Sequence, residues 1–139
     1  MNNNLYIGLM SGTSVDSVDT VLIDLEEDNI QLIGSCSYPI SGEIKQAVFS
    51  AVKSNSLSIE KISLLDETMA RVFIGAVQKI LSKEKKDSKD IIAIGSHGQT
   101  IKHSPNYPNP FSLQVGKAKI IANTTKITTV TSFRSQDIT

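Results

Sequence analysis

The sequence contains no tryptophan and a single cysteine, Cys36, and its positive and negative charges cancel. One cysteine excludes an internal disulfide, and 2 histidines without cysteine companions form no zinc-binding pattern. The balance of 14 basic and 14 acidic residues argues against a nucleic-acid partner or a membrane surface. No apolar run has the length of a membrane span, and the start of the chain lacks the basic residues of a signal peptide. These absences indicate a protein of the reducing cytoplasm, in which any phosphate binding depends on a local site.

The length and the apolar content are enough for one domain, because 40% of the 139 residues are hydrophobic. Three β-rich segments separated by small or acidic turn residues predict an antiparallel meander of Leu5–Met10, Val18–Leu25 and Asn29–Ser37. Apolar residues at three-and-four spacing then predict two helices, over 44–52 and over 62–81. The chain therefore begins in the order β-β-β-α.

The second half of the chain predicts further strands. Ile91–Ile94 does not alternate with polar residues, which is typical of a parallel strand covered on both faces, and we expect it at the centre of the sheet. Three prolines between 105 and 110 exclude regular structure there. Phe111–Val115 and Ile127–Val130 predict strands on either side of a short helix over Lys117–Asn123. The expected fold class is α/β, with a mixed sheet flanked by helices.

Polar clusters follow three of the predicted strands, at Ser11–Asp19, Ser96–Thr100 and Ser132–Asp137. Ligands collect outside the carboxyl ends of strands in open α/β sheets, so the clusters are expected to converge on one cleft. The first cluster offers a glycine, hydroxyls and backbone donors for phosphate oxygens, and Asp16 and Asp19 as carboxylates for Mg²⁺. The alternative is a simple hairpin turn in which Asp16 satisfies turn amides.

The second and third clusters carry side chains suited to a sugar. His97 is expected to donate to a substrate hydroxyl or to act as an acid or base, with Gln99 and Thr100 as hydroxyl partners. Alternatively, His97 only ties its loop to the backbone. Arg134 can bind a carboxylate or phosphate, or else simply pair with Asp137.

Four short motifs occur in an order and spacing that resemble those of the anhydro-N-acetylmuramic acid kinases. The motifs are Met10–Asp19, Ile94–Thr100, Ser112–Gly116 and Phe133–Ile138. The resemblance covers essentially the whole chain. It implies an actin/hexokinase-like (ribonuclease H-like) nucleotide-binding domain, a fold that begins with three antiparallel strands followed by helices.

The resemblance also implies a reaction and a set of site residues. Such kinases use ATP and water to convert 1,6-anhydro-N-acetylmuramic acid to N-acetylmuramic acid 6-phosphate during peptidoglycan recycling, so ATP with Mg²⁺ and the sugar are the expected ligands. The residues implied at the ATP phosphates are Gly12, Thr13, Ser14, Val15, Asp16, Ser17, Val18 and Asp19, with Asp16 and Asp19 also at Mg²⁺. The residues implied near the sugar are His97, Gln99, Thr100 and Arg134.

The sequence departs from the family pattern at three points. Ser17 stands where the family usually has glycine, which predicts a turn that is strained or reshaped, and Lys117 stands where an acidic residue would cap a helix. The resemblance places two further parts of the family sequence beyond Thr139: the motif that carries the general base and the adenosine-binding half. No catalytic residue is therefore expected within residues 1–139. We therefore expect a single amino-terminal sugar-kinase domain that lacks the carboxyl-terminal domain and is inactive alone.

Two other interpretations remain open at this point: a non-catalytic module that binds nucleotide or sugar, and an inactive remnant. A domain that normally meets a second half is expected to expose an unusually apolar surface. Such a surface would also favour self-association, for example into a homodimer.

Overall fold

The computed structural model describes residues 4–104, 108 and 111–131. The strands are β1 (Leu5–Ser11), β2 (Ser17–Glu26), β3 (Asn29–Pro39), β4 (Ile91–Ser96), β5 (Gln99–Ser104), β6 (Phe111–Val115) and β7 (Thr128–Val130). The helices are α1 (Gly42–Lys53), α2 (Ile59–Lys83), a short 3₁₀ turn η1 (Ser88–Asp90) and α3 (Ala118–Thr125). The β-β-β-α start expected from the sequence is confirmed.

Two of the sequence predictions fall outside the described residues. Arg134 lies outside them, together with the rest of the third polar cluster. Thr139, beyond which the resemblance places the general base, lies outside them as well. The sugar-binding role of Arg134 and the position of the base relative to Thr139 therefore stay predictions.

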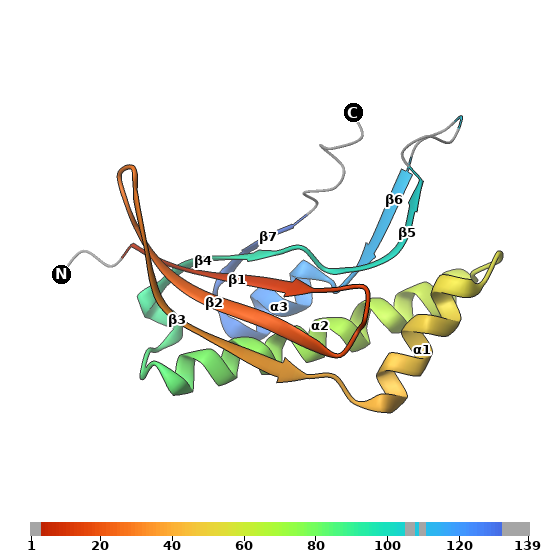
Figure 1. Cartoon of the computed structure of the whole chain (residues 1–139), viewed down its shortest axis with the longest axis horizontal. Coiled ribbons are helices and arrows are strands. Elements are labelled where there is room, and N and C mark those ends of the chain that lie inside the picture. Colours follow the sequence, from red (N-terminus) through yellow and green to blue (C-terminus); the bar gives the residue numbers. More distant parts are fainter. Residues whose placement is uncertain (1–3, 105–107, 109–110, 132–139) are drawn as a thin grey trace.

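A mixed sheet in the order β3-β2-β1-β4-β7 forms the body of the molecule (Figure 1). β1, β2 and β3 pair antiparallel, whereas β4 pairs parallel to β1 and β7 parallel to β4. β5 and β6 form a separate antiparallel pair that continues from the end of β4 and projects from one end of the sheet (Figure 1). The segment 99–104 is thus a strand, although the sequence predicted a loop directly after β4.

The sequence prediction for β4 was wrong in two respects. β1, not β4, is the central strand, and the two faces of β4 are not equally covered, because Ile92 is 45% exposed. The pairing with β1 explains the misleading pattern: Ile91 pairs with Leu5 and Ala93 with Tyr6, so Ile92 is an extra residue at a β-bulge. A bulge inserts one residue and thereby breaks the apolar–polar alternation that a one-sided strand would otherwise show.

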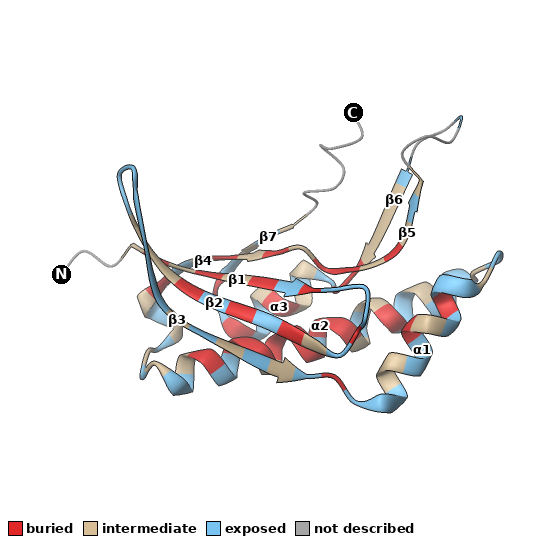
Figure 2. Ribbon diagram, viewed as in Figure 1, coloured by how far each residue is buried: buried red, intermediate tan, exposed pale blue. Residues whose placement is uncertain are grey.

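The core lies between the sheet and the helices. Leu5, Ile7 and Leu9 alternate with less buried residues along β1 and face the layer that contains α2 (Figure 2). Phe73, near the middle of α2, is completely buried. α3 packs against α2 and β7. Within the part of the chain that the structure describes, no helix has both the length and the apolar character needed to cross a bilayer.

The opposite face of the sheet is rich in apolar side chains yet open. Tyr6 and Ala93 form one cross-strand pair on this face, and Gly8 and Gly95 form the next. Met10 at the end of β1 is 56% exposed, and Val21 on β2 is 37% exposed. That this face meets a second domain stays a prediction.

The free edge of the sheet is partly protected by α2. Lys79 and Lys83 donate from their ammonium groups to the backbone carbonyls of Ser37 and Ser35 on the edge strand β3. Lysines at an edge discourage pairing with another chain. This protection leaves the far half of β3, which includes Ile30 and Leu32, uncovered among the described residues.

Candidate functional site

The first two polar clusters lie side by side at the carboxyl ends of β1 and β4. β1 and β4 are parallel neighbours, so their carboxyl ends meet there, and the His97 backbone N–H donates to the Leu9 carbonyl at 3.2 Å. The loop after β1 and the segment after β4 therefore start from adjacent positions. This is the placement that the rule for open α/β sheets predicted for a ligand site.

Gln99 joins the two clusters directly. Its side chain is buried, and its amide oxygen accepts a hydrogen bond from the Ser11 hydroxyl. Its amide nitrogen donates to the Gly12 carbonyl at 3.4 Å and to the Thr100 carbonyl at 3.3 Å. In this conformation the Gln99 amide holds the glycine loop against the start of β5. Gln99 therefore positions the loop, whereas its contact with a sugar stays a prediction.

The loop itself is a tight turn with a strained residue. The Val15 N–H donates to the Gly12 carbonyl at 3.2 Å, and Val15 has a φ of 53° with its side chain buried. A positive φ is unfavourable for a β-branched residue, and such strain is concentrated at functional sites. The sequence placed the strain at Ser17, which is wrong, because Ser17 begins β2 and pairs with Pro39 in extended backbone.

Gly12 is not required by the fold. Its φ lies outside the left-handed region, and a β-carbon at this position would contact nothing within 4 Å. Neither backbone strain nor packing therefore explains a glycine here. The open space beside Gly12 would allow a ligand to approach the backbone of this loop closely.

Asp16 is exposed and forms an ion pair with Lys45 of α1. The Lys45 hydrogen bond and charge, with a smaller contribution from a Ser14 hydrogen bond, hold the pKa of Asp16 below the ordinary value of 3.8. The carboxylate is therefore ionised at neutral pH. Because the pKa is lowered in the folded state, the contribution of the pair to stability is present above pH 3.8 and is lost as the pH falls below that value.

Removing the Lys45 charge should raise the pKa of Asp16. In Lys45→Met we expect the Asp16 carboxyl to titrate closer to 3.8 than in the unmodified chain, because its main stabilising partner is gone. Carboxyl-carbon NMR across an acid titration measures this shift. Lys53→Met, at the other end of α1, is the control and should leave the titration unchanged. An Asp16 titration that is the same in Lys45→Met would show that the ion pair does not persist in solution.

Asp19 and Asp16 offer carboxylate oxygens for a magnesium ion. Asp19 is exposed on β2, where the Ser37 hydroxyl donates to its Oδ1 at 3.0 Å. Among the described residues no group of three or more His, Cys, Asp or Glu side chains could form a complete protein-only metal site. Magnesium commonly uses only one or two carboxylates together with waters and substrate phosphates, so a site of that kind at Asp16 and Asp19 stays a prediction.

Of the residues predicted near the sugar, Gln99 and Thr100 begin β5 and His97 lies just before it. His97 is half-buried between β4 and β5. Thr100 is also half-buried, and its hydroxyl accepts a hydrogen bond from the Gln114 amide at 3.3 Å. Gln114 also donates to the Ser112 hydroxyl at 2.6 Å, so its amide joins residues of β5 and β6. Thr13 and Ser14 are exposed at the tip of the glycine loop, whereas Val18 is fully buried in β2.

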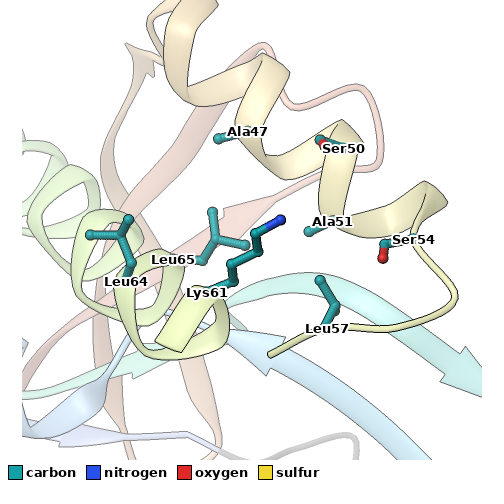
Figure 3. A pocket seen from close by; sticks show the side chains of 8 residues that line it. All are labelled: Ala47, Ser50, Ala51, Ser54, Leu57, Lys61, Leu64 and Leu65. Atoms are coloured by element: carbon teal, nitrogen blue, oxygen red, sulfur yellow. The ribbon is translucent and has the colours of Figure 1, made fainter. Parts of the chain in front are cut away.

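A separate cavity of about 260 Å³ lies between α1 and α2 (Figure 3). Its lining residues are Ala47, Ser50, Ala51, Ser54, Leu57, Lys61, Leu64 and Leu65. None of the residues predicted for the site is among them. The cavity is lined mainly by apolar side chains, with Lys61 as its one charged side chain (Figure 3).

Lys45 contacts Asp16 of the glycine loop, and the sequence did not predict this contact. It lies 29 positions after Asp16 and belongs to a helix with ordinary amphipathic spacing. The only local signal was a basic residue in the first turns of a helix, where the helix dipole favours acidic residues. The prediction that Lys117 leaves α3 without a side-chain cap is confirmed, because Lys117 occupies the N-cap position and makes no such hydrogen bond.

A mixed sheet with a glycine loop and a polar segment at the carboxyl ends of β1 and β4 defines an α/β protein with a candidate ligand site there. Comparison with known proteins makes the class specific. Residues 4–139 match the family described as anhydro-N-acetylmuramic acid kinase, and the chain belongs to that family.

Individual relatives agree with this assignment. The chain is 43% identical over 133 residues to an anhydro-N-acetylmuramic acid kinase of Photobacterium profundum, a match that covers 96% of this chain and 36% of the relative. It is 40% identical over 138 residues to the protein of that name from Shewanella loihica, covering 99% of this chain and 37% of the relative. The chain thus spans little more than a third of the length of the curated relatives it matches.

Proposed function

We propose that the chain supplies the phosphate-binding and part of the sugar-binding surface of a kinase that uses ATP and water to convert 1,6-anhydro-N-acetylmuramic acid to N-acetylmuramic acid 6-phosphate. Family membership supports the reaction class. The relatives extend well beyond the matched region, so the complete activity is assigned to a longer assembly of which residues 1–139 form one domain. An actin/hexokinase-like fold and a cytoplasmic location belong to the same proposal.

The observation that carries the proposal is the setting of Gly12. The fold does not need a glycine there, the space around it is open, and Gln99 fixes the loop from behind. Phosphate oxygens would accept hydrogen bonds from backbone N–H groups at Thr13 and Ser14, which are exposed at the tip. A glycine at position 12 allows those oxygens to approach the backbone closely.

The remaining residues act from either side of the loop. His97 and Thr100 would orient hydroxyl groups of the sugar, and Arg134 would contribute to the same surface. Asp16 and Asp19 would hold a magnesium ion, which neutralises phosphate charge when it is bound. Gln99 holds the end of β1 and the start of β5 in a fixed relative position, because its side-chain amide forms hydrogen bonds with Ser11 and Thr100. No residue of this chain is assigned as the general base.

Replacing Gly12 should weaken ATP binding without changing the thermal stability of the chain. In Gly12→Ala we expect an unchanged melting temperature, because the new methyl group meets no protein atom within 4 Å. We expect ATP to bind about tenfold more weakly or worse, because the methyl group would displace phosphate from charge-assisted hydrogen bonds. Thermal unfolding and NMR titration with ATP measure the two effects.

Gly42→Ala is the matched control, since a β-carbon at Gly42 also contacts nothing within 4 Å. It should change neither binding nor, beyond a small helix-propensity gain, stability. Unaltered ATP binding by Gly12→Ala would remove the glycine loop from the site. Loss of the fold in Gly12→Ala would instead assign that glycine a structural role.

A further inference from the structure

We propose that the Lys45 ammonium binds the nucleotide phosphates at this site and that Asp16 is its counter-ion when no phosphate is bound. The inference rests on the proposed function, because it assigns a cation to the phosphate loop of the kinase. It adds a residue from α1 to a site that was otherwise built from β1, β2 and the β4–β5 segment.

The glycine loop carries negative charge, so phosphate binding there needs a cation from another part of the chain. Residues 12–19 contain two aspartates and no lysine or arginine. A triphosphate brought to that segment alone would meet like charges, which weaken binding. Backbone N–H groups supply only partial positive charge. A cationic side chain contributed by another element would resolve this conflict.

Lys45 is held where such a cation is needed. The Ile40 N–H donates to the Asp16 carbonyl at 2.9 Å, which fixes the turn before α1 against the loop. Lys45, in the first turns of α1, then reaches the Asp16 carboxylate, and Asp16 lies two positions after Ser14 at the exposed tip of the loop. One carboxylate therefore separates the ammonium from a residue at the tip of the phosphate loop.

The placement of Lys45 is not explained by the stability of α1. The first turn of a helix carries a partial positive charge, so a lysine there is less favourable than one at the other end. Ser41 already caps the helix by accepting a hydrogen bond from the Ile44 N–H at 3.3 Å. With Ser41 as the cap and Glu43 in the first turn of α1, Lys45 supplies the positive charge that faces the loop.

The side chain can also exchange partners at low cost. Lys45 is partly exposed, and its ammonium lies 5.7 Å from the centre of the Phe49 ring. Contact with the ring face keeps a cation near this position while leaving its other directions open. An exposed ion pair is individually weak, so a phosphate of higher charge can displace the Asp16 carboxylate.

Titration with inorganic tripolyphosphate in the presence of EDTA tests the proposal on the 139-residue chain. Binding is followed by phosphorus NMR and calorimetry for the unmodified chain, Lys45→Met, Lys45→Arg, Asp16→Asn and the control Lys53→Met. Without a metal ion, Asp16 serves only as the partner of Lys45. We expect Lys45→Met to bind about tenfold more weakly or worse, and Asp16→Asn to bind more tightly than the unmodified chain, because it removes a like charge and releases Lys45. Lys45→Arg and Lys53→Met should retain binding.

The opposite behaviour of the two partners is the decisive result. If the ion pair only holds the loop in shape, Lys45→Met and Asp16→Asn break it equally and should weaken binding equally, which would overturn the proposal. Unchanged binding by Lys45→Met would overturn it as well. If the unmodified chain bound neither tripolyphosphate nor ATP, the proposed phosphate site itself would fail, a result distinct from failure of Lys45 alone. Thermal unfolding of every variant separates lost binding from lost fold.

Discussion

Gly116→Ala is expected to destabilise the protein by about 2–5 kcal/mol. Gly116 has a φ of 120°, and a β-carbon there would overlap the ring of Phe73, which is completely buried. Unfavourable backbone conformation costs roughly 1–2 kcal/mol, and overpacking a core typically adds about 1–3 kcal/mol. Since domains are stable by only about 5–15 kcal/mol, a large part of the protein should be unfolded at moderate denaturant concentrations. Chemical denaturation followed by circular dichroism measures the change.

The backbone at Gly116 cannot easily shift to relieve the overlap. Its N–H donates to the Asp66 carboxylate at 2.9 Å, and the next N–H, of Lys117, donates to the Asp66 carbonyl at 3.1 Å. Both bonds tie the end of β6 to α2. Gly42→Ala is again the comparison, because it adds a methyl group in open space at an ordinary φ. A loss of less than about 1 kcal/mol in Gly116→Ala would mean that Phe73 has room to repack.

Local patterns predicted most of the fold. The meander of β1, β2 and β3 and the two long helices follow from alternation, turn residues and helical spacing, which act over a few neighbours in sequence. Strand order does not have that local basis. Ile92 shows the limit, because only the register between β1 and β4 reveals that it occupies a bulge. The start of β5 was likewise hidden, since Gln99–Ser104 becomes a strand by pairing with residues 111–115.

The meeting of the first two polar clusters was predictable, but the contacts that join them were not. The Ser11–Asp19 and Ser96–Thr100 clusters were expected to meet, and they do so through Gln99. Nothing local in the sequence shows that the Gln99 side chain turns inward to the glycine loop. Lys45 illustrates the same point from another direction, because its contact with Asp16 depends on how α1 leaves the sheet.

The largest effect on activity should come from supplying the part of the family protein that this chain does not match. We expect no measurable phosphorylation of 1,6-anhydro-N-acetylmuramic acid by residues 1–139 alone. General acid–base catalysis contributes about a hundredfold to ten-thousandfold, and this chain is assigned no general base. In the relatives, nearly two thirds of the length lies outside the match. Adding that remainder as a separate protein should raise turnover at least about a hundredfold above either part.

The physical reason is that neither part would hold the whole ligand set. Closure of two domains around ATP and sugar excludes unwanted water and aligns the reacting groups, so the gain should depend on both surfaces at once. The same mixture made with Gly12→Ala should lose most of the gain, whereas a mixture with Gly42→Ala should keep it. The assay follows phosphorylated sugar, with size-exclusion chromatography to detect the complex. Turnover by residues 1–139 alone that is abolished by Asp16→Ala would contradict the expectation, because it would require a catalytic base within this chain.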